Sequence, residues 1–173
     1  MIFLGASQVL SVARTIQQRA DKLGVGRVRT NSNPNWYDSL ITEQALVRAT
    51  QKLFSDGHYG MAVEEAYKCL NNMVKKRSGL SADGASLMNS AFSAKSPILK
   101  LGNLTSQSDR DQQEGYMQIF AGCMTGIRNP RAHEHSYDDQ PETALEMLVW
   151  ANHLMRLVRY SKRVAKPRKR NTV

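Results

Sequence analysis

The chain is poor in cysteine and has no long hydrophobic run. Cys69 and Cys123 are the only cysteines among 173 residues, too few for a disulfide framework. Both fall within helical apolar patterns, so we interpret them as small buried side chains of a protein in a reducing compartment. No segment approaches the roughly 20 apolar residues of a membrane helix, and the N-terminal Met-Ile-Phe-Leu run is too short for a signal peptide. We therefore expect a cytoplasmic protein that does not bind membranes.

Several motifs of known enzyme classes are also missing. The sequence has no glycine-rich phosphate loop, no Gly-x-Ser-x-Gly nucleophile motif and no Cys-x-x-Cys pair. Aromatic residues make up only 7% of the chain and none lies within the basic C-terminal segment, which argues against base stacking there. His133, His135, Asp138 and Asp139 lie close together and can be read as metal ligands, but their spacing matches no strong ligand pattern. We predict no metal and no cofactor.

Charge is distributed unevenly along a composition that is otherwise typical of a soluble domain. Hydrophobic residues are 41% and charged residues 23%, with a formal net charge of +9. Residues 161–173 hold six basic residues and no acidic one, which leaves +3 for the rest of the chain. We interpret this segment as a flexible tail that either contacts the phosphates of a nucleic acid or only solubilises the chain. Its candidate substrate-binding residues are Lys166, Arg168, Lys169 and Arg170.

The hydrophobic periodicity is helical throughout. Residues 1–37 read as an N-terminal helix and a linker, and residues 38–160 as one domain. Within that domain, Asp38 or Ser39 is expected to cap a helix whose Ile41, Ala45, Ala49 and Leu53 recur every four residues. Further helices are expected at about 59–76, 83–92, 108–128 and from Pro141 onward, and no strand is expected. The prediction is an all-α, up-and-down bundle of four to five helices.

The predicted helix over residues 108–128 carries an unusual glycine stripe. Its core face is expected to contain Tyr116, Ile119, Phe120, Cys123 and Ile127. A second line holds Gly115, Gly122 and Gly126, which together cost about 3 kcal/mol of helix stability relative to alanine. Such a cost indicates close approach by another backbone. Either this helix is the centre of the bundle or a second subunit covers it, and we favour a dimer.

A cation and an imidazole bracket a proline at the end of this helix. Arg128 and His133 stand five positions apart, which on an undisturbed helix leaves them about 140° apart. Pro130 lies between them, so we expect the helix to kink or end there, with Asn129 outside helical geometry. Arg is suited to clamping phosphate oxygens and His to moving protons, a pair that suits metal-free RNA cleavage. The alternative is that both side chains merely cap the helix end and bond a nearby acid.

The chain resembles a known family over roughly residues 40–160. The matching stretches are Phe54-Ser-Asp-Gly-His-Tyr59 with Ala62-Val63, then Asp83-Gly84, Leu87-Met88, Ala91-Phe92, and Gly126-Ile-Arg-Asn-Pro-Arg-Ala-His-Glu134. These resemble the Ymh family of Abi-like prokaryotic proteins, which is similar to the HEPN superfamily of all-helical domains. Many HEPN domains are metal-independent ribonucleases with an Arg, a polar residue and a His a few positions later.

The resemblance implies a dimeric toxin or abortive-infection effector that cleaves RNA in phage defence. It assigns Arg128 and His133 as the catalytic pair and Asn129 as the polar helper, and we add Arg131 as a substrate-binding candidate. Expected partners are RNA, a second copy of the chain, and an antitoxin or regulatory protein. His135 stands where some HEPN toxins carry a tyrosine modified by their antitoxin, so we do not expect that route of neutralisation. The alternative function is a non-catalytic module that binds nucleotide, nucleic acid or protein.

Overall fold

A computed structural model describes residues 36–134 and 137–164. Its helices are α2 (Trp36–Leu40), α3 (Gln44–Ser55), α4 (Tyr59–Ser78), α5 (Gly84–Ala91), α6 (Gln107–Cys123), the π-helical η1 (Met124–Arg128), α7 (Asn129–His133) and α8 (Pro141–Tyr160). Two short strands, β1 (Leu99–Lys100) and β2 (Lys162–Arg163), complete the described part. The predicted all-α bundle is confirmed. In the residues described, no helix combines the length and apolar character needed to cross a membrane.

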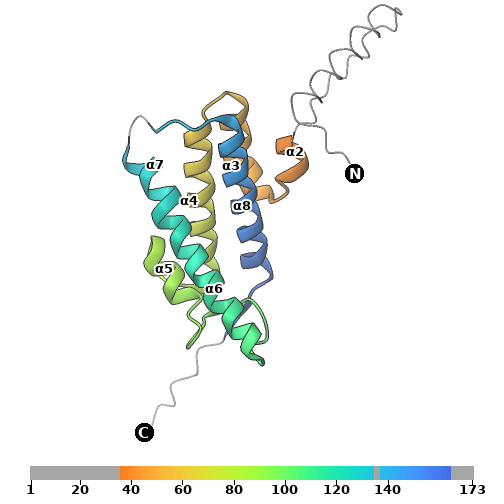
Figure 1. The fold of residues 1–173 in the computed structure, drawn as a ribbon, viewed down its shortest axis with the longest axis vertical. Coiled ribbons are helices and arrows are strands. Elements are labelled where there is room, and N and C mark those ends of the chain that lie inside the picture. The colour runs from red at the N-terminus through yellow and green to blue at the C-terminus, as the bar shows by residue number, and fades with distance from the viewer. Residues whose placement is uncertain (1–35, 135–136, 165–173) are drawn as a thin grey trace, which may run out of the picture. The chain divides into compact units, whose positions relative to one another are not determined.

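The helix α4 is the centre of the bundle. It packs against α3, α8, α5, η1 and α7 (Figure 1). Its apolar residues recur at helical spacing around much of the circumference, and Val63, Tyr67 and Leu70 are fully buried. Tyr67 also donates a hydrogen bond from its hydroxyl to the Met147 carbonyl of α8 at 3.1 Å. The sequence alone had favoured the helix at 108–128 for this central place or for an interface between subunits.

The start of α3 differs from the prediction. Neither Asp38 nor Ser39 caps it, because α2 ends at Leu40 and α3 begins at Gln44. The free N–H groups of Thr42 and Glu43 instead donate to the Asn152 side chain of α8, both at 2.9 Å. The buried face of α3 holds Leu46 and Thr50, one position after the predicted Ala45 and Ala49.

The strands tie the end of the described chain to the connector before α6. Leu99 pairs with Arg163 in an antiparallel register, and the Val164 N–H donates to the Ile98 carbonyl at 2.9 Å. Strands were not expected from the sequence, since segments of two residues carry no periodicity. The predicted tail residues Lys166, Arg168, Lys169 and Arg170 lie outside the described residues, as do residues 1–35 and His135.

Candidate functional site

The helix that carries Arg128 continues through Pro130 without a break. Asn129 is helical, with φ −64° and ψ −43°, and its N–H donates to the Met124 carbonyl five residues earlier. The predicted helix end at Pro130 and the predicted non-helical geometry of Asn129 are therefore wrong. A proline ring normally collides with the carbonyl four residues before it, and the wider π-helical turn gives that ring room. The helix ends at His133, and Glu134 is extended.

This continuity decides which side chains share a face. Asn129 and His133 are four positions apart within α7 and therefore lie on one side of it. Arg128 and His133 keep the separation of about 140° that an unbroken helix imposes. The structure thus brings Arg128 to Asn129, whose Oδ1 accepts from the Arg128 Nη1 at 3.2 Å, but gives no contact between Arg128 and His133. His133 is exposed at the end of the helix.

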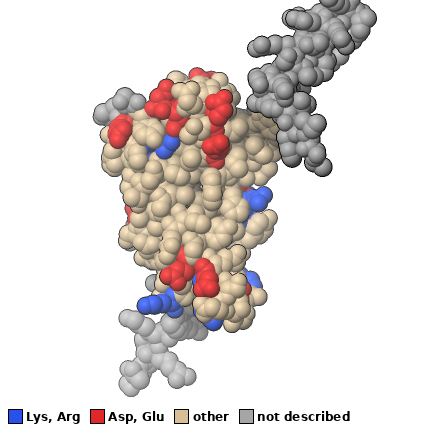
Figure 2. Space-filling model, viewed as in Figure 1, with Lys and Arg blue, Asp and Glu red and all other residues tan. Residues whose placement is uncertain are grey.

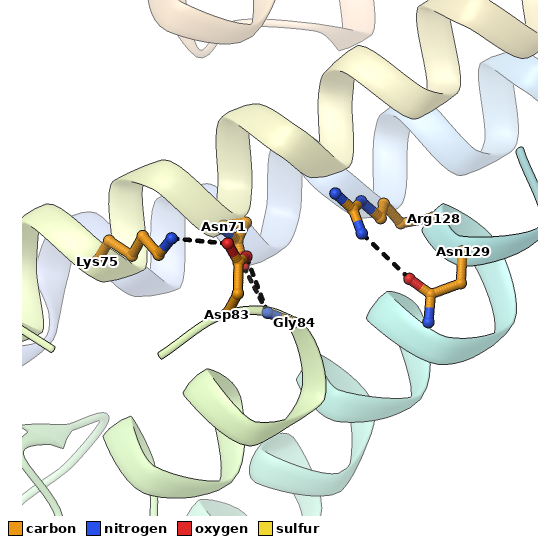
Figure 3. Close-up of polar contacts among 6 residues, drawn as sticks. All are labelled: Asn71, Lys75, Asp83, Gly84, Arg128 and Asn129. Atoms are coloured by element: carbon orange, nitrogen blue, oxygen red, sulfur yellow. Dashed lines mark hydrogen bonds and ion pairs between the residues drawn. The ribbon is translucent and has the colours of Figure 1, made fainter. Parts of the chain in front are cut away.

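Arg128 is half-buried, and its side chain extends toward α4 (Figure 3). Its one hydrogen bond within the described residues is the bond to neutral Asn129. No carboxylate there forms an ion pair with it. A guanidinium without a counterion retains its donors and its charge for an anionic ligand.

Arg131, by contrast, is fully engaged. Its side chain is 5% exposed, and its Nε and Nη2 donate to the two Asp139 carboxylate oxygens at 2.7 and 2.6 Å. Its Nη1 donates to the Ile127 carbonyl at 2.8 Å, and the guanidinium carbon lies 4.5 Å from the centre of the Tyr137 ring. These contacts hold the segment before α8 against α7. Substrate binding by Arg131 stays a prediction, and its geometry is that of a structural anchor.

The alternative of a metal site gains no support from these contacts. Both Asp139 carboxylate oxygens accept hydrogen bonds from Arg131. Across residues 36–134 and 137–164, no three His, Cys, Asp or Glu side chains are grouped so that they can hold a metal ion.

Neither cysteine is placed to act as a nucleophile. Cys123 is buried and Cys69 half-buried, and both are free thiols. Burial raises the pKa of each thiol above its ordinary value, which keeps the reactive thiolate scarce at neutral pH. For Cys69, nearby Arg48 partly opposes that increase in pKa. Thiol chemistry at these positions is therefore disfavoured.

The glycine stripe lies on an open face. A Cβ atom at Gly115, Gly122 or Gly126 would meet no atom within 4 Å, and Ile119 is 37% exposed instead of buried. The residues that the structure describes therefore do not cover this helix from all sides, which disfavours the reading of it as the centre of the bundle. Figure 2 shows few charged side chains over the middle of the face on which α6 lies. The outer side of α6 and η1 presents Gly122 and Gly126 beside the exposed side chains of Gln118, Ile119 and Thr125.

A second polar group, which the motif had not pointed to, lies near Arg128. Asn71 interrupts the apolar stripe of α4, is 7% exposed, and accepts from the Gly84 N–H at 3.0 Å. Asp83 caps α5 and accepts from the Lys75 ammonium group at 2.7 Å (Figure 3). The Lys75 hydrogen bond is the largest of the effects that hold the pKa of Asp83 below its ordinary value, so Asp83 remains a carboxylate. The signal available in the sequence was Asn71, a polar residue within an apolar stripe.

The fold and the site together define a small all-helical bundle with a π-bulged helix that ends in an Arg-Asn pair and an exposed His. Comparison with protein families then identifies it more closely. The model of the family described as "Protein of unknown function (Hypoth_ymh)" matches residues 41–158, and the chain belongs to this family. The match runs from just before α3 into α8 and includes the whole candidate site. No curated protein and no solved structure matches the chain.

Proposed function

We propose that the protein is a HEPN-type, metal-independent endoribonuclease that acts as a homodimer, in the role of a toxin or abortive-infection effector. Arg128 is the phosphate clamp, His133 the general base, and Asn129 the group that orients Arg128. The observation that carries the proposal is the contrast between two arginines on one helix. Arg131 is neutralised by Asp139, whereas Arg128 bonds only a neutral amide among the described residues.

The reaction is an internal phosphoryl transfer. His133 takes the proton from a ribose 2′-OH, the 2′-oxygen attacks the adjacent phosphorus, and the bond to the 5′-oxygen breaks. The 5′-oxygen leaves with a proton from solvent. The products are a 2′,3′-cyclic phosphate and a 5′-hydroxyl. Arg128 stabilises the charge that builds on the phosphoryl oxygens in the transition state.

Two observations support a shared site between two copies. Arg128 and His133 diverge by about 140° around one helix, so a phosphate held by one is poorly placed for the other on the same chain. Among the described residues, nothing packs against the glycine face of α6 and η1, so this face is available to a second copy of the chain. In a two-fold dimer, each proposed site would combine Arg128 of one copy with His133 of the partner subunit.

Cleavage of RNA in the presence of EDTA tests the proposal. Wild-type protein should release fragments with 2′,3′-cyclic phosphate ends, and His133→Ala or Arg128→Ala should lower the rate at least about 100-fold. Arg156→Ala, an exposed cation on α8, serves as the matched control and should cleave like wild type. Equal rates for wild type and His133→Ala would contradict the proposal. RNA binding that weakens steeply with salt and yields no product would favour the non-catalytic module instead.

A further inference from the structure

A large cleft lies on the side of α4 that faces away from Arg128. It has a volume of about 760 Å³ and is formed by α3, α4, α8 and β2. Met73 and Lys76 of α4 line it, whereas Asn71 and Lys75 lie on the other side of that helix. Asn71 and Met73 are two positions apart in sequence, so their side chains point about 160° apart around the helix. The cleft and the Arg128 site therefore lie on opposite faces of α4.

The cleft is lined by five basic residues, of which four form no ion pair within the described part of the chain. Its single acid, Glu43, is paired with Arg159. The other basic lining residues are Arg48, Lys76, Arg77 and Arg163, and none of the four forms an ion pair with another described residue. Cations gathered in one concave site repel one another and raise the local concentration of anions.

Two of these cations are positioned by contacts with the chain itself. The Arg77 Nη2 donates to the Ser161 carbonyl at 2.5 Å, while the Arg77 Nε is buried and has no hydrogen-bond partner among the described residues. The guanidinium of Arg163 lies against Gly79, where an added Cβ would come within 2.7 Å of its Nη2. Gly79, in the left-handed conformation at the end of α4, thus leaves room for Arg163.

Helix ends explain only part of this charge. Lys76 and Arg77 lie in the last turn of α4, where cations interact favourably with the helix dipole. Arg48 lies in the middle of α3, so no helix end accounts for its place at the cleft.

The rest of the lining is partly apolar, with Gln44 and Asn72 as its neutral polar residues. Ala45, Met73 and Met155 contribute hydrophobic surface beneath the ring of cations. Pockets of about 300–1,000 Å³ with apolar walls and a few placed polar groups are typical of small-molecule sites. We infer that this cleft binds a nucleoside polyphosphate, with the phosphates on Arg48, Lys76, Arg77 and Arg163 and the base against the apolar floor. This inference is independent of the proposed cleavage of RNA.

Calorimetric titration of the full chain with ATP, inorganic triphosphate and adenosine tests the inference. ATP should bind most tightly, inorganic triphosphate more weakly because it lacks the base, and adenosine not measurably because it lacks the phosphates. Arg48→Glu with Lys76→Glu should weaken ATP binding at least about tenfold, since each charge-assisted contact contributes strongly. Both side chains are at the surface, so the fold should survive their exchange.

The matched control is Lys95→Glu with Arg156→Glu, which reverses two exposed charges that do not line the cleft. It should bind ATP like wild type. Absence of both ATP and triphosphate binding at millimolar concentration would overturn the inference. Equal loss of binding in the control variant would also overturn it, as would RNA binding that depends on Arg48 and Lys76 without any ATP binding. His133→Ala should leave ATP binding unchanged. The test of ATP binding therefore does not depend on whether the protein cleaves RNA.

Discussion

Arg128 and Arg131 stand three positions apart on one continuous helix and differ in every contact they make. The sequence marks both as basic residues beside a proline, and the spacing to His133 singles out Arg128. It does not show that Asp139, eight positions after Arg131, accepts from both the Nε and the Nη2 of that guanidinium. Their pairing depends on the path of the segment between α7 and α8, which passes Gly60 closely enough to exclude a side chain there.

Breaking the Arg131–Asp139 pair should destabilise the fold. Both side chains are 5% exposed, so Arg131→Leu leaves a buried carboxylate without its partner. We expect the free energy of unfolding to fall by about 3–5 kcal/mol, measured by urea denaturation. Arg128→Leu, at a half-buried position with no ion pair among the described residues, should change it by less than about 1 kcal/mol. An equal decrease in the free energy of unfolding in both variants would contradict the structural role given to Arg131 and the phosphate-binding role given to Arg128.

At the scale of the elements, local patterns predicted the helices well and their ends poorly. The expected helices at 59–76 and 83–92 agree closely with α4 and α5, because apolar spacing and the Asp83 cap are local signals. The start of α3 was misplaced because its capping group, Asn152, comes from α8, far along the chain. The end of α7 was misplaced because the rule that proline breaks helices assumes α geometry, and η1 is a π-helical turn.

Two glycines offer a direct test of the element geometry. Gly122 lies in α6 with open space at its Cβ position, so Gly122→Ala should raise the free energy of unfolding by about 1 kcal/mol in dilute protein. Gly60 lies in α4 where a Cβ would come within 2.5 Å of the Tyr137 carbonyl oxygen, so Gly60→Ala must displace that segment. It should lower stability by about 1–3 kcal/mol. Thermal or urea unfolding of both variants measures these changes, and stabilisation by Gly60→Ala would contradict the described packing.

At the scale of the molecule, the sequence predicted the class of fold and the family. The all-α bundle followed from periodicity, and the family match over residues 41–158 covers that bundle. The sequence does not show which helix is central, because several helices carry apolar stripes that are compatible with a central position. The structure gives that position to α4 and leaves α6 and η1 with an uncovered glycine face. Because no described residue covers this face, self-association is part of the proposed function.

The shared site is tested most directly by mixing two inactive variants. If Arg128 and His133 act from different copies, a heterodimer of Arg128→Ala and His133→Ala contains one intact site and one empty site. After subunit exchange at equal concentrations, RNA cleavage in EDTA should recover to about one quarter of the wild-type rate, since half of the dimers then carry one site of two.

A control variant makes the result specific to the glycine face. Gly122→Arg, placed in both partners, should give monomers on sizing and should prevent recovery, because the added side chain projects from the face proposed as the interface. Recovery of RNA cleavage to about a quarter by the mixture, and its loss with Gly122→Arg, is the result predicted by a site shared between two copies. No recovery from the mixture, with wild-type protein active and dimeric under the same conditions, would contradict it.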